Sequence, residues 1–473
     1  MSFIPDPDRE KRWMRFVLAT YLLLNAIVWL SINEDIRLTY AGDGSSWYQP
    51  SVGFYLTGDF IDPNNPDAST TYRPPAFPIF AATLFKVFGG PSPGAIAFGQ
   101  IILLLLTGFL FRNIVNDWLP GWGAAGMALL LLNPNVFTIA QYTQSDTLFF
   151  FFMTIALWGV LCIAKGRTSL RYPLIIGAAL AFACLTRATA QFLIIALPIA
   201  LPLIDLANQT LRRIPGSFAK GLAAAAVAVV LLIPWASYVQ NIEGAYDLSS
   251  SEVKARYIWD QIAILEAQYS GISYHDSEAK QVAQHAALAA GYGEKWLQMS
   301  EPEQYRAILR EGYRTLLSYP ALSIAEAYAR SIFQFLMAGG SGRWHYLILE
   351  GPGQLTTLWF KTEQTNVLGM VREYFRSGSG MVLLASVVCI AFVLIARALA
   401  LVGIAAIATD KQWSLLVVLL AYISYFAFVH LFVGNSRYRI SVEPALMLLF
   451  LYGFASLYSR FRDWRLRENT HHE

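Results

Sequence analysis

Two acids and three arginines lie where long apolar runs begin or end, and their side chains have complementary chemistry. Asp43 lies in the glycine-flanked stretch TYAGDGSSWYQP, after the first apolar run. Asp146 opens the run in QYTQSDTLFFFF, and Arg187 separates two runs in CLTRATAQF. Arg437 and Arg439 precede the last run in GNSRYRISVEP. Guanidinium groups bind phosphate through forked, charge-assisted hydrogen bonds, and a carboxylate can take the proton of an attacking hydroxyl.

Each of these residues also has an ordinary structural interpretation. Asp146 could cap or charge-stabilise the start of a helix. Arg187 could extend to the lipid headgroups. Arg437 and Arg439 could bind lipid phosphate without specificity, and Asp43 could be a turn residue. Ionisable groups at such depth usually face a cavity or a partner, so convergence of all five on one membrane face favours a functional site.

Aromatic residues accompany these charges. Trp47, Tyr48 and Tyr72 suit the apolar faces of a sugar ring, although Trp and Tyr are common at membrane interfaces in any case. Gly42 and Gly44 would let the loop bring Asp43 close to a sugar and an acceptor hydroxyl. Aromatic rings for a sugar, arginines for a phosphate and a carboxylate for a proton together predict glycosyl transfer from a polyprenyl-phosphate sugar.

The composition requires a membrane. Of the 473 residues, 56% are hydrophobic and 14% are charged, whereas soluble domains carry about 25% charged residues. The net charge of +3, without a clustered basic and aromatic face, argues against a nucleic-acid partner. Cys162, Cys184 and Cys389 lie inside apolar runs, which predicts core packing, and no CxxC motif or His/Cys cluster suggests structural zinc.

Hydropathy and length predict about ten spanning helices. They fall near residues 13–32, 93–111, 120–134, 146–164, 171–186, 188–205, 219–238, 380–403, 412–433 and 439–459. The first is interpreted as an uncleaved helix rather than a signal peptide. A shorter apolar helix is expected along the interface near 76–88.

Basic residues give the orientation. With an even number of helices, the charged loops and both termini fall on one side, which the positive-inside rule makes cytoplasmic. The residues that set this side are Arg9, Lys11, Arg12, Arg15, Arg112, Lys165, Arg167, Arg171, Arg212, Arg213, Lys220, Lys411, Arg460, Arg462, Arg465 and Arg467. The external segments are then 33–92 and 239–379, and the second shows helical patterning.

The expected fold is an all-α polytopic membrane protein with an external cap. Its predicted divisions are an N-terminal transmembrane module, 1–238, an external helical loop domain, 239–379, and C-terminal transmembrane helices with a cytoplasmic tail, 380–473.

Several short motifs, in order along the membrane body, resemble the GT-C membrane glycosyltransferases. The nearest branches are the bacterial relatives of protein O-mannosyltransferases and the lipid A aminoarabinose transferases. The motifs are DGSSWYQPSVGFYLTGDF, TYRPPAFPIFAATLFKVFGG, QSDTLFFFFMTIAL, LTRATAQFLIIALPIAL, LLIPWASYVQN and NSRYRISVEPALML. Residues 245–379 show no such resemblance.

The resemblance implies roles for individual residues. Asp43 matches the acid of the first external loop, which is the catalytic base or lies beside it, and Asp146 matches a second acid. Arg73 matches the charged residue of a charged–Pro–Pro element. Tyr72 replaces the acid of the aminoarabinose branch, and Gly44 replaces the second acid of the mannosylating branch. The motif PWASYVQN also lacks the family's arginine, so the sugar and the acceptor stay open.

The sequence therefore predicts a membrane enzyme that moves a sugar from a polyprenyl-phosphate donor to an acceptor hydroxyl with inversion. The phosphate would be held by Arg73, Arg187, Arg437 and Arg439. A divalent cation is the one cofactor considered, held by Asp43 and Asp146.

The other expected partners are a glycan, lipid or protein acceptor and membrane lipids. The predicted location is the bacterial inner membrane, with the site on its periplasmic face. The alternatives are a lipid-linked sugar flippase, a glycan ligase or polymerase with a diphosphate-linked donor, and a structural or assembly protein.

Overall fold

The computed structural model describes residues 7–39, 43–64, 71–349 and 380–471. The helices before the cap are α1 (Pro7–Ser31), α2 (Glu34–Thr39), α3 (Gly44–Thr57), α4 (Ala76–Phe88), α5 (Pro93–Trp118), α6 (Gly123–Leu131), α7 (Pro134–Ile139), α8 (Asp146–Ala164), α9 (Arg171–Thr186), α10 (Gln191–Ala207) and α11 (Ile214–Glu243). The others are α12 (Ser251–Ser270), α13 (Tyr274–Tyr292), α14 (Glu294–Gln298), α15 (Glu301–Ser318), α16 (Ala321–Met337), α17 (Ser341–Leu349), α20 (Gly380–Thr409), α21 (Trp413–Val429), α22 (Ser436–Arg439) and α23 (Glu443–His471).

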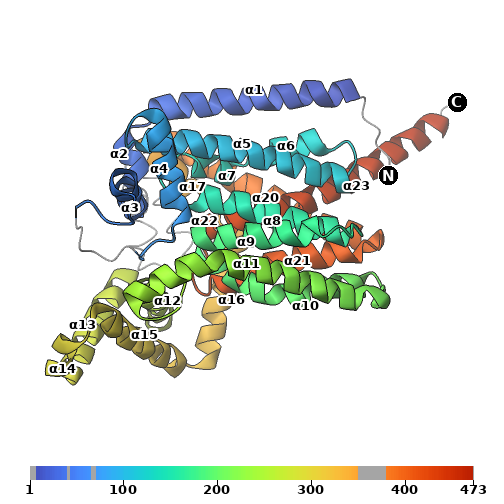
Figure 1. The fold of residues 1–473 in the computed structure, drawn as a ribbon. Coiled ribbons are helices and arrows are strands. Elements are labelled where there is room, and N and C mark those ends of the chain that lie inside the picture. Colours follow the sequence, from blue (N-terminus) through green and yellow to red (C-terminus); the bar gives the residue numbers. More distant parts are fainter. Residues whose placement is uncertain (1–6, 40–42, 65–70, 350–379, 472–473) are drawn as a thin grey trace.

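Long apolar helices run side by side and form the body of the molecule (Figure 1). In the described part of the chain, 7 helices are long and apolar enough to cross a bilayer, and α9 and α21 are shorter apolar helices. A helix lies in every predicted span, and α4 coincides with the predicted interfacial helix. The prediction of an all-α polytopic membrane protein is therefore confirmed.

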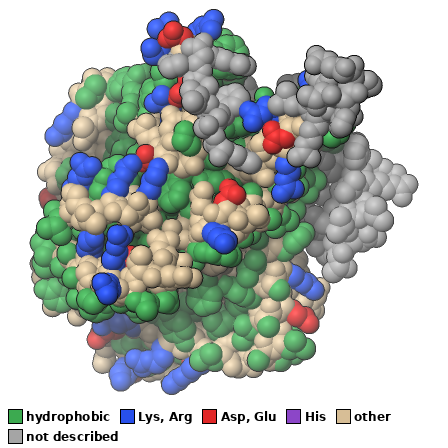
Figure 2. All heavy atoms as spheres, turned by 90° about the vertical axis from the view of Figure 1, so that its right-hand side faces the viewer, with side chains coloured by type: hydrophobic (Ala, Val, Ile, Leu, Met, Phe, Trp, Pro, Cys, Tyr) green, Lys and Arg blue, Asp and Glu red, His purple; other side chains and the backbone are tan. Residues whose placement is uncertain are grey.

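The two ends of this bundle differ in character. Both termini of the chain lie at the same end (Figure 1). Figure 2 views the molecule from that side and shows several groups of Lys and Arg side chains. We call it the basic end. The opposite end carries α2, α3 and the helices α12–α15, which project from the bundle and are called the cap.

The third predicted span is wrong in extent. A full crossing was expected over 120–134, but α6 has 9 residues, which extend only about 14 Å at 1.5 Å per residue. The chain breaks at Asn133, whose side chain accepts a hydrogen bond from the Asn135 backbone, and Pro134 starts the short α7. Non-helical backbone at membrane depth is tolerated where protein surrounds it, and residues 133–146 are buried apart from Pro134.

Buried partners hold this segment between α6 and α8. Asn133 donates to Glu443, Asn135 donates to the Ser436 carbonyl, and Gln141 donates to Asn25. These contacts tie the segment to α23, α22 and α1. They fix the point at which α8 begins, and Asp146 is its first residue.

The cap is joined to the bundle by specific hydrogen bonds. Tyr257 of α12 donates to the Val429 carbonyl at 2.9 Å, and the Gln261 side chain accepts from the Phe432 amide at 2.8 Å. Glu243, at the end of α11, accepts from Thr71 at 2.8 Å. Glu243 also accepts from the Ser251 amide at the start of α12, so it links the cap to the segment between α3 and α4. The predicted boundary at 238 falls inside α11, and the one at 379 lies outside the described residues.

Candidate active site

Five charged side chains form one alternating chain of ion pairs at the cap end of the bundle. Arg73 pairs with Asp43 at 3.2 Å, and Asp43 pairs through its other oxygen with Arg437 at 2.6 Å. Arg437 also reaches Asp146 at 3.0 Å, and Asp146 pairs in turn with Arg187. We call these five residues the site chain. Segments of the sequence as far apart as 43 and 437 therefore meet at one place.

Close backbone packing positions Asp43. It directly precedes α3, whose first residue is Gly44. A Cβ atom at Gly44 would lie 2.1 Å from the carbonyl oxygen of Leu38, so only glycine permits this approach of α3 to α2. Glycine is needed at position 44 because the backbones of α2 and α3 pack closely there, and not because of an unusual backbone angle. Gly42 lies outside the described residues.

Arg73 is held between two aromatic rings. Its guanidinium lies 4.5 Å from the centre of the Trp47 ring and 4.8 Å from that of Tyr72. It also donates to the Ser46 hydroxyl at 2.6 Å. Stacking of this kind fixes the plane of the guanidinium. One edge of the guanidinium is thereby held toward Asp43.

Asp146 takes the helix-start position considered for it but also makes ion pairs, and Arg187 is directed into the site. Asp146 is in the first turn of α8, but its two oxygens are bound by Arg437 and Arg187. Arg187 follows α9 in an extended conformation, and its side chain turns to Asp146 and lies 5.5 Å from the ring of Tyr438. It therefore does not extend to the lipid headgroups. A position at the start of α8 does not by itself require the two ion pairs that Asp146 makes with Arg187 and Arg437.

Arg439 lies in a different cluster. Its side chain is fully buried and binds Glu443 at 2.8 Å. It also donates to the backbone carbonyls of Phe335, Leu336 and Ala338 at the end of α16. The structure does not bring Arg439 to the site chain, although the sequence grouped it with Arg437.

The predicted sugar-binding aromatics have different surroundings. Trp47 is 2% exposed and packs edge-on against Phe77, so its ring faces protein. Tyr48 is half-buried and packs against Phe85 between α3 and α4. Tyr72 lies beside the site chain, with Arg73 on it and Arg256 of the cap 5.9 Å from its ring. Of the three, Tyr72 has the position best suited to contact a substrate.

The arginines around Asp43 determine its acidity. Burial raises the pKa of this carboxyl, but the charges of Arg437 and Arg73 together outweigh burial and hold the pKa below its usual value. Asp43 is therefore ionised at neutral pH and can accept a proton. Its side chain is 35% exposed, which makes it the most accessible member of the two pairs it forms.

The cap contributes residues that the sequence analysis did not identify. Asp260 of α12 lies close enough to Asp43 and Glu278 for their charges to act on it, and Tyr257 and Tyr274 lie near Asp260. These residues belong to the segment without family resemblance, where only helical periodicity was available. Each of the two helices α12 and α13 has a tyrosine three or four residues before an acid, and this spacing could have indicated a polar face.

The cation expected between the acids has a competitor. Arg437 binds both Asp43 and Asp146, so a guanidinium occupies the position between the two carboxylates. No group of three or more His, Cys, Asp or Glu side chains suited to a metal occurs in the described ranges. The arrangement does not fit a cation shared by the two acids, and no step below passes through one.

Comparison with protein families gives one match. Residues 72–238 match the model of the dolichyl-phosphate-mannose-protein mannosyltransferase family. This region covers less than half of the chain and contains Arg73, Asp146 and Arg187. A comparison with curated proteins gives no match.

Solved structures resemble almost the whole chain. The archaeal oligosaccharyltransferase AglB from Archaeoglobus fulgidus, in complex with an inhibitory peptide and a dolichol-phosphate, has 15% identity and a TM-score of 0.51, covering 97% of this chain and 52% of that chain. The structure of the Archaeoglobus fulgidus oligosaccharyltransferase in the apo form has 14% identity and a TM-score of 0.52, with the same coverage of both chains. ArnT from Cupriavidus metallidurans bound to undecaprenyl phosphate has 13% identity and a TM-score of 0.40, covering 92% and 77%.

The two oligosaccharyltransferase structures, with TM-scores above 0.5, confirm the resemblance at the level of the fold. The chain spans about half the length of the AglB structures it matches, with 52% of that chain covered. The protein has the GT-C membrane fold, in which four members of the site chain lie in or next to the helices between α2 and α10, and α22 carries the fifth.

Proposed function

We propose that this protein is a membrane glycosyltransferase that transfers a sugar from a polyprenyl-phosphate donor to an acceptor hydroxyl. The observation that carries the proposal is the site chain, which joins three arginines and two carboxylates beneath the cap. The match to a mannosyltransferase family and the AglB complex with a dolichol-phosphate support a lipid-linked donor.

The charges of the site chain suit a phosphate. Three arginines face two carboxylates, so the cluster carries one excess positive charge before Arg343 is considered. Arg343 is buried, and its charge also acts on Asp146. A phosphodiester carries one negative charge, so it would balance the excess charge of the site chain itself, and forked guanidinium groups would orient the phosphate oxygens.

The donor phosphate would also activate Asp43. In the structure Arg437 is shared between Asp43 and Asp146. A phosphate that takes the Asp43 side of Arg437 would remove a positive charge from that carboxylate, and its pKa would rise toward the range of an effective base. Asp43 would thus become an effective base only after the donor has bound.

The chemical step would be a single displacement. The acceptor oxygen attacks the anomeric carbon while Asp43 takes its proton. The bond between that carbon and the phosphate oxygen breaks, and the phosphate leaves with the electron pair on the opposite face. The configuration is therefore inverted. A phosphate leaving group is weakly basic, so one carboxylate suffices, unlike the pair in glycosidases.

The location follows from the same proposal. The lipid tail of the donor stays in the bilayer, so the site must be at a membrane edge. The basic end would face the cytoplasm, which places the site chain and the cap on the periplasmic face of a bacterial inner membrane. The acceptor would enter between Tyr72 and the cap, where Arg256 and Asp260 lie.

Release of polyprenyl phosphate from a labelled donor tests the proposal. Asp43→Asn should fold and still bind donor, yet turn over roughly 10²-fold more slowly or worse, the scale of general base catalysis. The matched control is Asp276→Asn, an exposed acid of the cap whose turnover should equal that of the wild type. Wild-type turnover by folded Asp43→Asn, or transbilayer movement of an intact donor without transfer, would reject the enzyme in favour of another role.

A further inference from the structure

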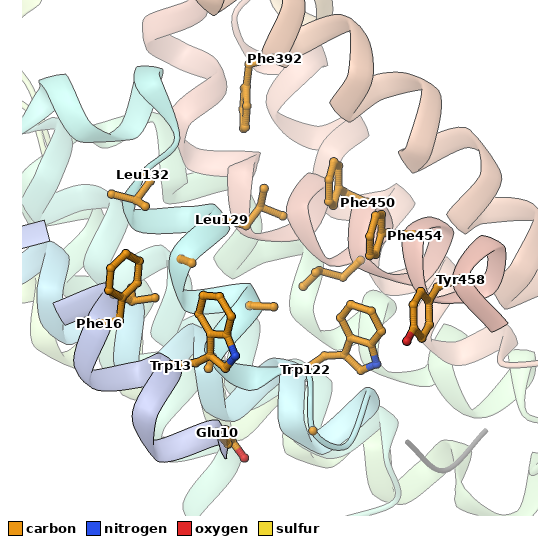
Figure 3. A pocket seen from close by; sticks show the side chains of 16 residues that line it. Glu10, Trp13, Phe16, Trp122, Leu129, Leu132, Phe392, Phe450, Phe454 and Tyr458 are labelled. Atoms are coloured by element: carbon orange, nitrogen blue, oxygen red, sulfur yellow. The ribbon is translucent and has the colours of Figure 1, made fainter. Parts of the chain in front are cut away.

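A large apolar groove opens toward the basic end, and no residue of the site chain lines it. It has a volume of about 910 Å³ and lies between α1, α6, α20 and α23. Figure 3 shows Trp13 and Phe16 of α1 facing it from one side, and Phe450, Phe454 and Tyr458 of α23 from another.

Small residues on α6 create the groove. Ala124, Ala125 and Ala128 line it opposite the aromatic side chains of α1 and α23. Its one acid is Glu10, which pairs with Arg112 at 2.8 Å and so adds no free negative charge. In a bilayer such a groove is filled by an apolar chain, because hydrocarbon is the surrounding solvent.

A polar pocket adjoins the groove. Its volume is about 210 Å³, and it shares Trp122 and Tyr458 with the groove. Arg460 and Arg462 of α23 line it together with Asp410 at the turn after α20. Arg462 also lies 3.6 Å from Asp463, an exposed pair that contributes little.

We propose that the groove and the pocket together bind one anionic phospholipid. Its acyl chains lie in the groove, and its phosphate lies in the pocket that the long side chains of Arg460 and Arg462 both line. The apolar lining alone cannot select a lipid, because acyl chains are as apolar as the side chains they meet. Selection comes from the headgroup, since each Arg near a membrane surface contributes about 1 kcal/mol toward an anionic lipid.

The surrounding charge fixes the class of lipid. Arg12 and Arg15 of α1 are exposed at the same end of the bundle. The lining of the pocket has two arginines and one acid, Asp410, and Asp463 beside Arg462 lies outside that lining. The excess positive charge favours a headgroup with net negative charge over a zwitterionic one.

Native mass spectrometry of the full-length protein tests this site. The protein in detergent is incubated with equal amounts of phosphatidylglycerol and phosphatidylcholine that have the same acyl chains. The wild type should retain phosphatidylglycerol preferentially. The double variant Arg460→Gln/Arg462→Gln should reduce that preference roughly tenfold or more. Arg465→Gln, on the same helix, is the matched control and should keep it, because Arg465 stacks on Phe461 and lines neither cavity.

Two further variants test the groove separately from the charges. Ala125→Trp and Leu132→Trp each place a large ring in the groove and leave both arginines unchanged, so the phosphatidylglycerol adduct should be lost. Equal retention of the two lipids by the wild type overturns the proposal. So does a preference that survives the double variant or either groove-filling variant, and so does a second protein copy in place of lipid.

Discussion

Arg437 and Arg439 are two residues apart, yet they belong to charge clusters of different design. Arg437 joins the site chain, whose acceptors are the carboxylates of Asp43 and Asp146. Arg439 binds Glu443 and three backbone carbonyls of α16. We call the Arg439 group the anchor cluster, with Arg397 as a further partner of Glu443 at 3.6 Å.

The nature of the acceptors separates the two clusters. Backbone carbonyls at a helix end cannot leave Arg439 without moving α16, and both members of its ion pair have at most 1% exposure. Asp43 is 35% exposed and precedes a short helix, so an incoming anion can compete for Arg437. Exposure and exchangeable acceptors, rather than the presence of arginine, distinguish a binding cluster from a structural one.

The largest expected effect concerns the anchor cluster. Arg439→Ala leaves Glu443 with only Arg397 and Asn133, and breaking a buried pair costs about 3–5 kcal/mol of the free energy of unfolding. Arg437→Ala should cost less, because Arg73 and Arg187 still pair with Asp43 and Asp146. Denaturant unfolding in detergent measures both. An equal loss for the two variants would remove the distinction between the clusters.

Helical geometry explains why the sequence could not separate these arginines. Residues two apart on a helix differ by about 200° around its axis, so side chains at 437 and 439 point to nearly opposite faces. The sequence motif grouped them because it records position along the chain, and the short α22 was not predicted.

Elsewhere, too, the sequence predicted what depends on hydropathy and did not predict what depends on tertiary contacts. Hydropathy placed the helices that bring Asp43, Asp146 and Arg187 to one end, because apolar length is a strong signal. The early end of α6 depends on buried amide contacts such as Asn133 with Glu443. The burial of Trp47 likewise depends on tertiary packing, which a single sequence does not show.

The next largest effect tests whether Arg437 binds the donor phosphate. Lysine carries one point charge and cannot bridge two carboxylates and a phosphate, so Arg437→Lys should weaken donor binding roughly tenfold or more, the scale of one charged hydrogen bond. Binding of a labelled polyprenyl-phosphate sugar measures it. Arg439→Lys is the matched control, and its folded fraction should bind donor like the wild type. Unchanged binding by Arg437→Lys would place the phosphate elsewhere.

A smaller effect should appear on acidification. The pKa of Asp43 in the folded protein lies below the ordinary value of 3.8. Its ion pairs therefore contribute stability that is fully present above about pH 4 and is lost as the pH falls through the folded pKa. The unfolding midpoint of the wild type should exceed that of Asp43→Asn at pH 7, and the gap should narrow below pH 4. A gap that is constant with pH would show that Asp43 is not stabilised as an anion.

The smallest expected effect concerns Asp260, where the cap faces the site chain. Partial desolvation by neighbouring atoms and the charges of Glu278 and Asp43 raise the pKa of this carboxyl to about 6. Asp260 is itself exposed, so solvent screening keeps the effect on stability small. The folded protein therefore binds a proton between about pH 4 and 6 that the unfolded chain does not, so this group stabilises the fold as the pH falls through that window. Above pH 6 the ionised carboxylate lowers the free energy of unfolding.

Asp260→Asn should then be slightly more stable than the wild type at pH 7, and this advantage should disappear toward pH 4. Thermal unfolding in detergent across that range measures it, with Glu311→Gln, an exposed acid of α15 paired with Arg314, as control. If Asp260→Asn followed the wild type at every pH, the cap would not hold Asp260 against Asp43, and entry of an acceptor between Tyr72 and the cap would lose its structural basis.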